Sequence, residues 1–142
     1  MHVTLSRWFN LVLVPFWGLL LTAFLQSTRP FPAIELGVGL LLGLISGYLQ
    51  NRAISARPSE FLAAQTVRGV RRALFGSSSG KASIVLMWLN GVGLLLWAMA
   101  FAPDMFVGAW LSGVAAFGLA RELMSFPGVL HLGHLRATGH GS

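Results

Sequence analysis

The stretch NRAISARPSEFLAAQTVRGVRRALFGSSSGKAS, residues 51–83, decides the fold because it gathers basic side chains between two pairs of long apolar runs. It holds six of the ten Lys and Arg residues of the chain. Cytoplasmic loops of membrane proteins carry an excess of Lys and Arg, and this excess sets the direction in which neighbouring helices cross. We therefore expect residues 51–83 to form a basic cytoplasmic loop between two pairs of membrane-spanning helices.

The composition of the whole chain agrees with this expectation. Of its 142 residues, 55% are hydrophobic and 10% are charged, and the mean hydropathy is +0.72. A soluble domain averages about 25% charged residues, so this chain has too few charges to cover a water-exposed surface. Its formal net charge of +6 predicts contact with anionic lipid headgroups and no binding of nucleic acid, because no motif of that class is visible. The absence of cysteine excludes disulfides and thiolate chemistry.

Four apolar runs predict membrane-spanning helices at about residues 8–26, 34–50, 84–101 and 105–123. A helix needs about 20 residues to cross the hydrocarbon layer, and the fourth run is short, so whether it crosses fully or re-enters stays open. Short proline-containing connections follow the first and third runs, so we expect each pair to form an antiparallel hairpin. The expected fold class is an all-α membrane protein, a single membrane domain over residues 1–142, with four transmembrane helices as two antiparallel hairpins joined by a cytoplasmic amphipathic helix.

The remaining cations give the orientation. Arg7, Arg121 and Arg136 lie on the same side as the central loop when the chain crosses four times, and only Arg29 is left outside. We expect a multi-pass protein of the cell inner (cytoplasmic) membrane, with its N-terminus and its tail at 125–142 in the cytoplasm.

Residues of about 60–75 in the central loop have the pattern of an amphipathic helix in the membrane interface. A turn of about 100° per residue places apolar residues on one side and Arg68, Arg71 and Arg72 on the other. The same faces suit a helix packed on a partner protein, and both interpretations stay open. We expect the three arginines to bind anionic lipid or a partner, and the run at 76–80 to end the helix as a flexible linker.

Small residues recur four positions apart in two of the predicted spans. Gly39, Gly43 and Gly47 share one face of the second span, and a weaker series in the fourth span consists of Gly108, Ser112 and Ala116. Such faces let helix backbones approach closely in a membrane. Packing within the chain and packing between subunits both remain open at this stage.

Motifs that would carry chemistry are incomplete. The run at 76–82 resembles a phosphate-binding Walker loop, but it has three residues between its glycines instead of four and an alanine after Lys81. Ser46 and Ser112, each followed by glycine, resemble an intramembrane serine nucleophile, yet no span offers an activating base. We therefore predict no catalytic residue and no cofactor.

The tail contains His131, His134 and His140. The first two are three residues apart, so they would share a face of a helix and could hold a metal ion. Pro127 and Gly128 weaken the helix there, and no cysteine or carboxylate follows. We assign no metal site, and metal binding by the tail stays open.

The length and the two-hairpin plan resemble the small multidrug exporters, whose function depends on a glutamate in the first span. The predicted first span has no glutamate. Asn90 is the carboxamide that lies deepest in a predicted span, where interhelical hydrogen bonding is its expected role.

We therefore expect a non-catalytic small integral membrane subunit, or an assembly or scaffold factor, of a larger inner-membrane complex of secretion, conjugation or respiratory type. Its partners would be other membrane protein subunits, and homo-oligomerisation stays open. The alternative is a homo-oligomeric channel or facilitator with a polar path near Asn90, to which Ser46 and Ser112 would contribute. An enzyme that uses the tail histidines is a third hypothesis.

Overall fold

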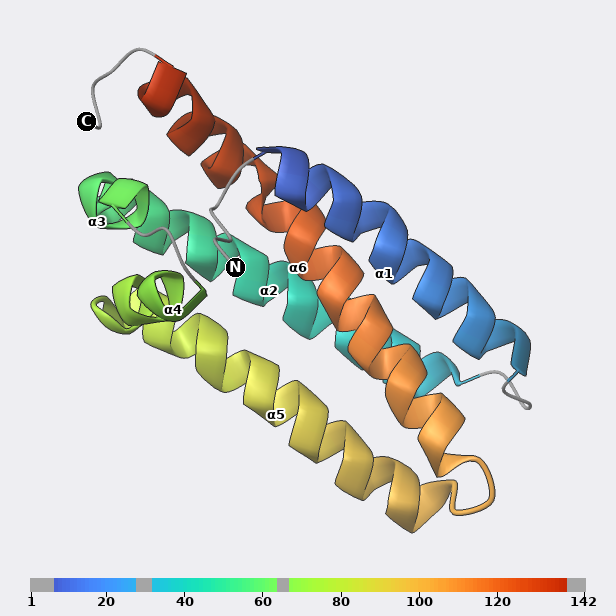
Figure 1. Cartoon of the computed structure of the whole chain (residues 1–142). Helices are drawn as coiled ribbons and strands as arrows, with labels where there is room; N and C mark the ends of the chain where they lie inside the picture. The colour runs from blue at the N-terminus through green and yellow to red at the C-terminus, as the bar shows by residue number, and fades with distance from the viewer. Residues whose placement is uncertain (1–6, 28–31, 64–66, 138–142) are drawn as a thin grey trace.

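The computed structural model describes residues 7–27, 32–63 and 67–137, and every regular element in this part of the chain is an α-helix (Figure 1). The expectation of an all-α protein is thus confirmed. The helices are α1 (Arg7–Ser27), α2 (Ala33–Ala56), α3 (Pro58–Ala63), α4 (Val67–Phe75), α5 (Ser78–Phe101) and α6 (Phe106–Ala137).

Three segments are long and apolar enough to cross a membrane, namely Ala33–Ala56, Ser78–Phe101 and Phe106–Gly128. The described apolar part of α1, Val12–Gln26, is shorter. The third of these segments begins one residue after the start of the predicted fourth span, at 105–123, and extends it at its C-terminal end. A membrane protein is therefore indicated, while the fourth crossing by α1 remains a prediction.

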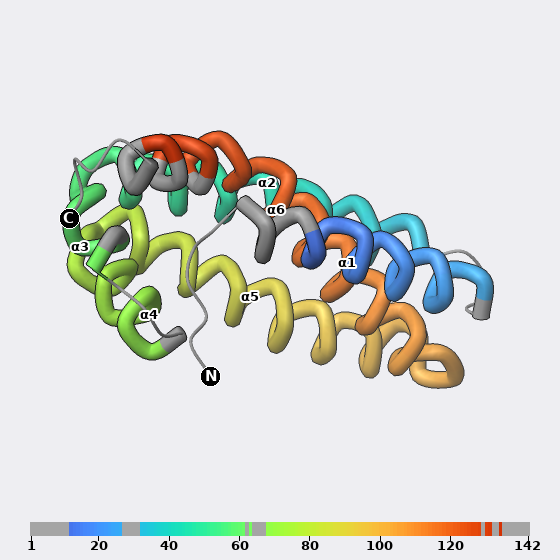
Figure 2. The backbone as a smooth tube through the Cα atoms, turned by 45° about the horizontal axis from the view of Figure 1, so that its top comes forward, coloured from blue at the N-terminus to red at the C-terminus, as the bar shows by residue number. Residues whose placement is uncertain are grey.

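The four long helices lie side by side and alternate in direction (Figure 1). The short helices α3 and α4, the start of α1 and the end of α6 lie at one end of the bundle, which we call the loop end. The end of α1, the start of α2 and the α5–α6 connection lie at the other end. Figure 2 shows α3 and α4 gathered at the loop end, beside the last turns of α2 and the first turns of α5.

Helix packing does not follow the two predicted hairpins. The closest partners are α2 and α6, and α5 packs against both of them. Among the described residues, α1 contacts α6 but not α2, so the first expected hairpin is not confirmed. A side chain at Gly118 of α6 would collide with the ring of Trp17, which explains how α1 comes close to α6 instead.

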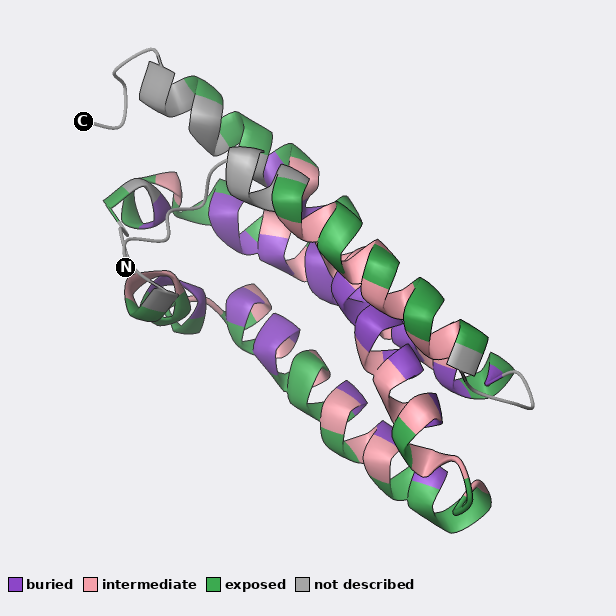
Figure 3. Ribbon diagram, turned by 45° about the vertical axis from the view of Figure 1, so that its right-hand side comes forward, coloured by how far each residue is buried: buried purple, intermediate pink, exposed green. Residues whose placement is uncertain are grey.

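Burial follows this packing (Figure 3). Buried residues of α2 and α6 face one another, whereas α5 leaves most of its length exposed or half-buried. A separate apolar cluster at the loop end joins α2, α3, α4 and α5, and consists of Ala53, Ile54, Phe61, Ala73, Leu74 and Ile84. These apolar residues of α3 and α4 are buried against α2 and α5, while the placement of the helix in the membrane interface stays a prediction.

Several predicted boundaries also differ. The amphipathic helix consists of two short helices, and residues 64–66 between them lie outside the described residues. Only Gly76 and Ser77 of the run at 76–80 connect α4 with α5, which begins at Ser78. Ser77 caps α5 by accepting a hydrogen bond from the Gly80 N–H at 3.0 Å. The sixth helix has 32 residues and continues through Pro127 into the predicted tail.

Candidate functional site: a groove beside Asn90

The glycine face of α2 packs on α6 within the chain. A Cβ atom at Gly43 would lie 2.5 Å from the Phe117 carbonyl oxygen and 2.8 Å from the Ala120 Cβ. A Cβ at Gly47 would lie 2.7 Å from the Arg121 carbonyl oxygen. These distances are too short for any side chain, so only glycine lets the two backbones come this close.

The three residues of the weaker small-residue series in α6 do not all contribute to the contact with α2. Ala116 is buried, and its Cβ would lie 3.2 Å from a Cβ at Gly39. Ser112 is buried and donates a hydrogen bond to the Gly108 carbonyl oxygen of its own helix at 2.8 Å. Gly108 itself is only half-buried. The close contact along α6 instead includes Gly113, which was absent from the predicted series.

A reciprocal serine pair joins α2 to α5 near the loop end. The Ser46 and Ser83 hydroxyl oxygens are 2.8 Å apart, and each hydroxyl also approaches the carbonyl oxygen of the other residue, at 3.1 and 2.9 Å. Both serines are fully buried. Their hydroxyls are therefore used to hold two helices together.

Asn51 supports α6 beside Pro127. Its side-chain amide donates to the Met124 carbonyl oxygen, and its Oδ1 accepts a hydrogen bond from the Gly128 N–H at 3.1 Å. Met124 and Gly128 are four residues apart, so in an uninterrupted helix they would bond to each other. One carboxamide thus satisfies both backbone groups at the point where proline weakens the ladder, and this explains why the helix continues.

The other face of α2 forms a groove with α5. It encloses about 410 Å³ and is lined by Ile34, Val38, Leu42, Leu89, Asn90, Gly93, Leu94 and Trp97. All of these side chains are apolar except Asn90, which is 2% exposed. Its Oδ1 atom accepts no hydrogen bond from any described residue. A Cβ at Gly93 would meet no atom within 4 Å, so the groove wall is open there.

This groove is the candidate functional site, because a buried polar atom without a partner needs an explanation in a folded protein. Its oxygen is a hydrogen-bond acceptor, and it belongs to the polar side chain that lines an otherwise apolar groove. A hydrogen bond from the Trp110 indole to the Gly91 carbonyl oxygen at 2.8 Å fixes α6 against α5 near the groove.

The other predicted site residues lie elsewhere. Arg68, Arg71 and Arg72 are exposed on α4. His131 and His134 are exposed on the last turns of α6, and His140 lies outside the described residues. Among the described residues no three His, Cys, Asp or Glu side chains come together in a way that could hold a metal ion.

Sequence reasoning missed Asn51, Ser83 and Arg121 as interior polar groups. Asn51 and Ser83 each lie one residue outside a predicted span, at 34–50 and 84–101. The signal for Asn51 was Pro127 itself, since a proline inside a helix needs a donor or acceptor from elsewhere to satisfy the freed backbone.

Comparison with protein-family models, with curated proteins and with solved structures finds no match to this chain.

Proposed function

We propose that this protein is a non-catalytic integral membrane subunit or assembly factor, and that the groove between α2 and α5 holds a transmembrane helix of a partner protein. The observation that carries the proposal is the unpartnered Asn90 Oδ1 in an apolar groove. An unsatisfied polar group costs several kcal/mol in the hydrocarbon of a membrane. In the interior of a protein, a buried acceptor without a partner costs about 1–3 kcal/mol. A bound donor would remove that cost.

The chemistry of the groove favours a protein helix as the occupant. A lipid acyl chain can fill apolar space, but it has no donor for Asn90. A helix can fill the same space and present a Ser, Thr, Asn or Gln side chain, which are the residues that bond across membrane helices. Gly93 leaves room for close approach, as small residues do in membrane helix interfaces.

The channel alternative depends on the same asparagine, but it needs the two serines as well. Ser46 is engaged with Ser83, and Ser112 is bonded to its own helix. Neither serine lines the groove. The channel is therefore the weaker proposal, and flux through liposomes that contain the purified protein tests it directly.

Site-specific photocrosslinking tests the docking proposal. A photoreactive amino acid at Leu89, which lines the groove, should give a discrete protein adduct in native membranes, and the same group at the exposed Val92 of α5 should not. The Asn90→Leu substitution should remove the Leu89 adduct. An adduct of twice the chain mass would show that a second copy occupies the groove, and crosslinks to lipid alone at both positions would also contradict the proposal.

The proposal includes four membrane crossings, with residues 51–83 and both termini on the cytoplasmic side of the inner membrane. The lopsided basic charge supports it, and so does the alternating direction of the long helices (Figure 1). Because the chain has no cysteine, single-cysteine variants can test it. In intact cells an impermeant maleimide should label Asp104→Cys but not Ser59→Cys, two exposed positions at opposite ends of the bundle. The reverse pattern would contradict the proposed orientation.

A further inference from the structure

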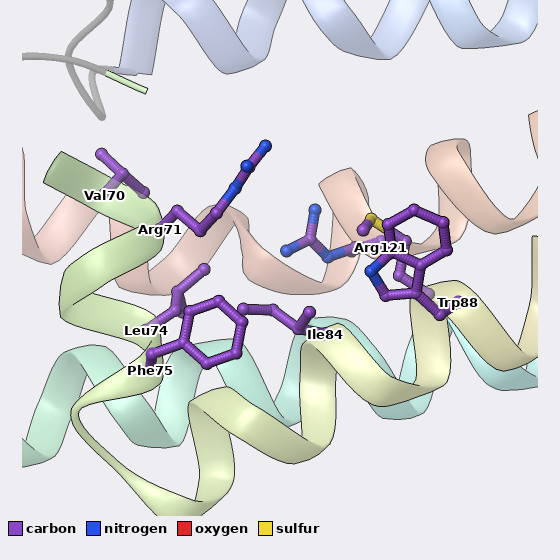
Figure 4. A pocket seen from close by; sticks show the side chains of 8 residues that line it. Val70, Arg71, Leu74, Phe75, Ile84, Trp88 and Arg121 are labelled. Atoms are coloured by element: carbon purple, nitrogen blue, oxygen red, sulfur yellow. The ribbon is translucent and has the colours of Figure 1, made fainter. Parts of the chain in front are cut away.

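A second cavity lies at the loop end, between α4, α5 and α6 (Figure 4). It encloses about 440 Å³. Two arginines line it, Arg71 from α4 and Arg121 from α6, and most of the remaining wall is apolar. The larger apolar side chains are Leu74, Phe75, Ile84 and Trp88. The two cations come from helices that are far apart in the sequence, and the fold brings them to one space.

The positive charge of this cavity is not balanced by its own lining. None of the described acidic residues lines it. Glu60 pairs instead with Arg57 at 3.3 Å. Glu122 interacts electrostatically with Arg121, its neighbour in the chain, but it does not line the cavity. The Nε atom of Arg121 is buried and donates no hydrogen bond to any described residue. A buried guanidinium donor without an acceptor is costly, so a bound anion would stabilise this arrangement.

The cationic and the apolar side chains that line the cavity together indicate which kind of ligand fits it. Guanidinium groups bind phosphate oxygens through several N–H donors in a planar fork, while Leu74, Phe75 and Ile84 offer contact to hydrocarbon. Basic pockets between membrane helices at the cytoplasmic surface are suited to anionic lipid headgroups. We infer that this cavity is a binding site for the phosphate group of an anionic phospholipid, with Arg71 and Arg121 as its two ligands.

This site differs from the lipid contact that the sequence predicted. The sequence pattern grouped Arg71 with Arg68 and Arg72, as an exposed basic face of one helix. Only Arg71 of those three lines the cavity, and its counterpart is Arg121 on α6. The inference rests on the membrane placement in the proposed function, but it does not depend on the partner groove beside Asn90.

Lipid titration of the purified, delipidated protein in detergent tests the inference. Thermal stability would be measured against phosphatidylglycerol, phosphatidylcholine and inorganic phosphate in separate series. Phosphatidylglycerol should stabilise the protein saturably, and Arg71→Gln and Arg121→Gln should each weaken its apparent affinity by about five- to tenfold. The matched control is Arg68→Gln, an exposed position on α4 outside the cavity, which should change the affinity by less than about twofold.

Three outcomes would overturn the inference. These are equal stabilisation by phosphatidylcholine, a loss of affinity in Arg68→Gln as large as in Arg71→Gln, and full stabilisation by inorganic phosphate to which the lipid adds nothing. The last outcome would assign the site to a free anion. If Arg121→Gln does not fold, two other variants decide the question. Arg71→Gln changes an exposed position, and Arg121→Lys keeps the charge. Arg121→Lys should bind phosphatidylglycerol more tightly than Arg71→Gln does. The photocrosslinking test at Leu89 does not depend on these measurements, so the lipid site and the partner groove can be contradicted separately.

Discussion

The two faces of α2 make different kinds of contact, although their residues are interleaved along the same helix. Gly39 and Gly43 bring the backbone of α2 against α6, where even one added carbon atom would collide. Val38 and Leu42 each precede one of these glycines, and they line a groove of about 410 Å³ with α5. One face is filled by the chain itself, whereas the other leaves space beside Asn90, whose Oδ1 has no partner among the described residues.

This difference separates residues that hold the fold together from residues that are available for binding. In a membrane, lipid provides no hydrophobic force between helices, so association depends on close packing and on interhelical hydrogen bonds. The α2–α6 face uses both, through its glycines and through Asn51. The α2–α5 face has interhelical hydrogen bonds between Ser46 and Ser83, on the side of the groove nearer the loop end. We therefore expect substitutions to have graded effects on stability.

The largest effect should come from filling the close contact between α2 and α6. Gly43→Leu places a side chain where Phe117 and Ala120 already lie, and it should destabilise the protein by about 3 kcal/mol or more. Denaturant unfolding in detergent, followed by circular dichroism, measures this change.

The matched control is Gly37→Leu on the same helix, where a Cβ would meet no atom within 4 Å. It should leave stability within about 1 kcal/mol of the wild type. Equal losses of stability in Gly43→Leu and Gly37→Leu would show that the two faces of α2 do not differ in how closely they are packed.

The second effect should come from removing the support of α6 at Pro127. Asn51→Ala leaves the Met124 carbonyl and the Gly128 N–H without their side-chain partner, which should cost about 2 kcal/mol. Hydrogen exchange should increase at Gly128 and in the turn that follows it. Ser55→Ala, one turn further along α2 at an exposed position, should change neither quantity.

A smaller effect should come from the serine pair. Ser46→Ala and Ser83→Ala should each cost about 1 kcal/mol, because each single substitution leaves a buried hydroxyl with fewer partners. The double variant should cost less than the sum, and the coupling energy should be about 0.6–1 kcal/mol. Strict additivity in unfolding experiments would mean that the two hydroxyls do not interact.

The smallest effect on the isolated chain should come from Asn90. Because its Oδ1 makes no hydrogen bond to described residues, Asn90→Leu replaces an unsatisfied polar group by an apolar one of similar size. Such a change is nearly neutral or stabilising, so we expect a change within about 0.5 kcal/mol. A loss comparable to that of Gly43→Leu would show that Asn90 holds the fold together, and that the groove is structural.

Much of this fold could be predicted from periodicity and composition, but the pairing of helices could not. The glycine spacing in α2 marks a face for close packing, yet the same spacing fits any neighbouring helix. The choice of α6 depends on Gly113 and Ala120, which stand out only when the two helices are placed together. Connection length predicted a hairpin of α1 with α2, whereas the match of Trp17 to Gly118 favours α6.

The candidate site was predicted only in part. Asn90 is visible in the sequence as a carboxamide inside an apolar run, but its lack of a partner is a property of the packed helices. The central arginines were visible as a cluster, whereas the position of Arg71 and Arg121 around one cavity requires that α4 fold back against α5. The end of α6 was expected near residue 123 because proline breaks helices by local rules, and Asn51 provides the distant bond that overrides those rules.

The continuity of α6 through Pro127 has a geometric consequence. Its 32 residues correspond to a rod of about 48 Å, while the hydrocarbon layer is about 30 Å thick. A tilt of about 50° would be needed to submerge it, and helices in membranes tilt by about 40° at most. If α6 crosses a membrane, its ends therefore extend out of the hydrocarbon layer, and the final turns with His131 and His134, which follow the turn that Asn51 supports, are the part of α6 nearest to water at the loop end.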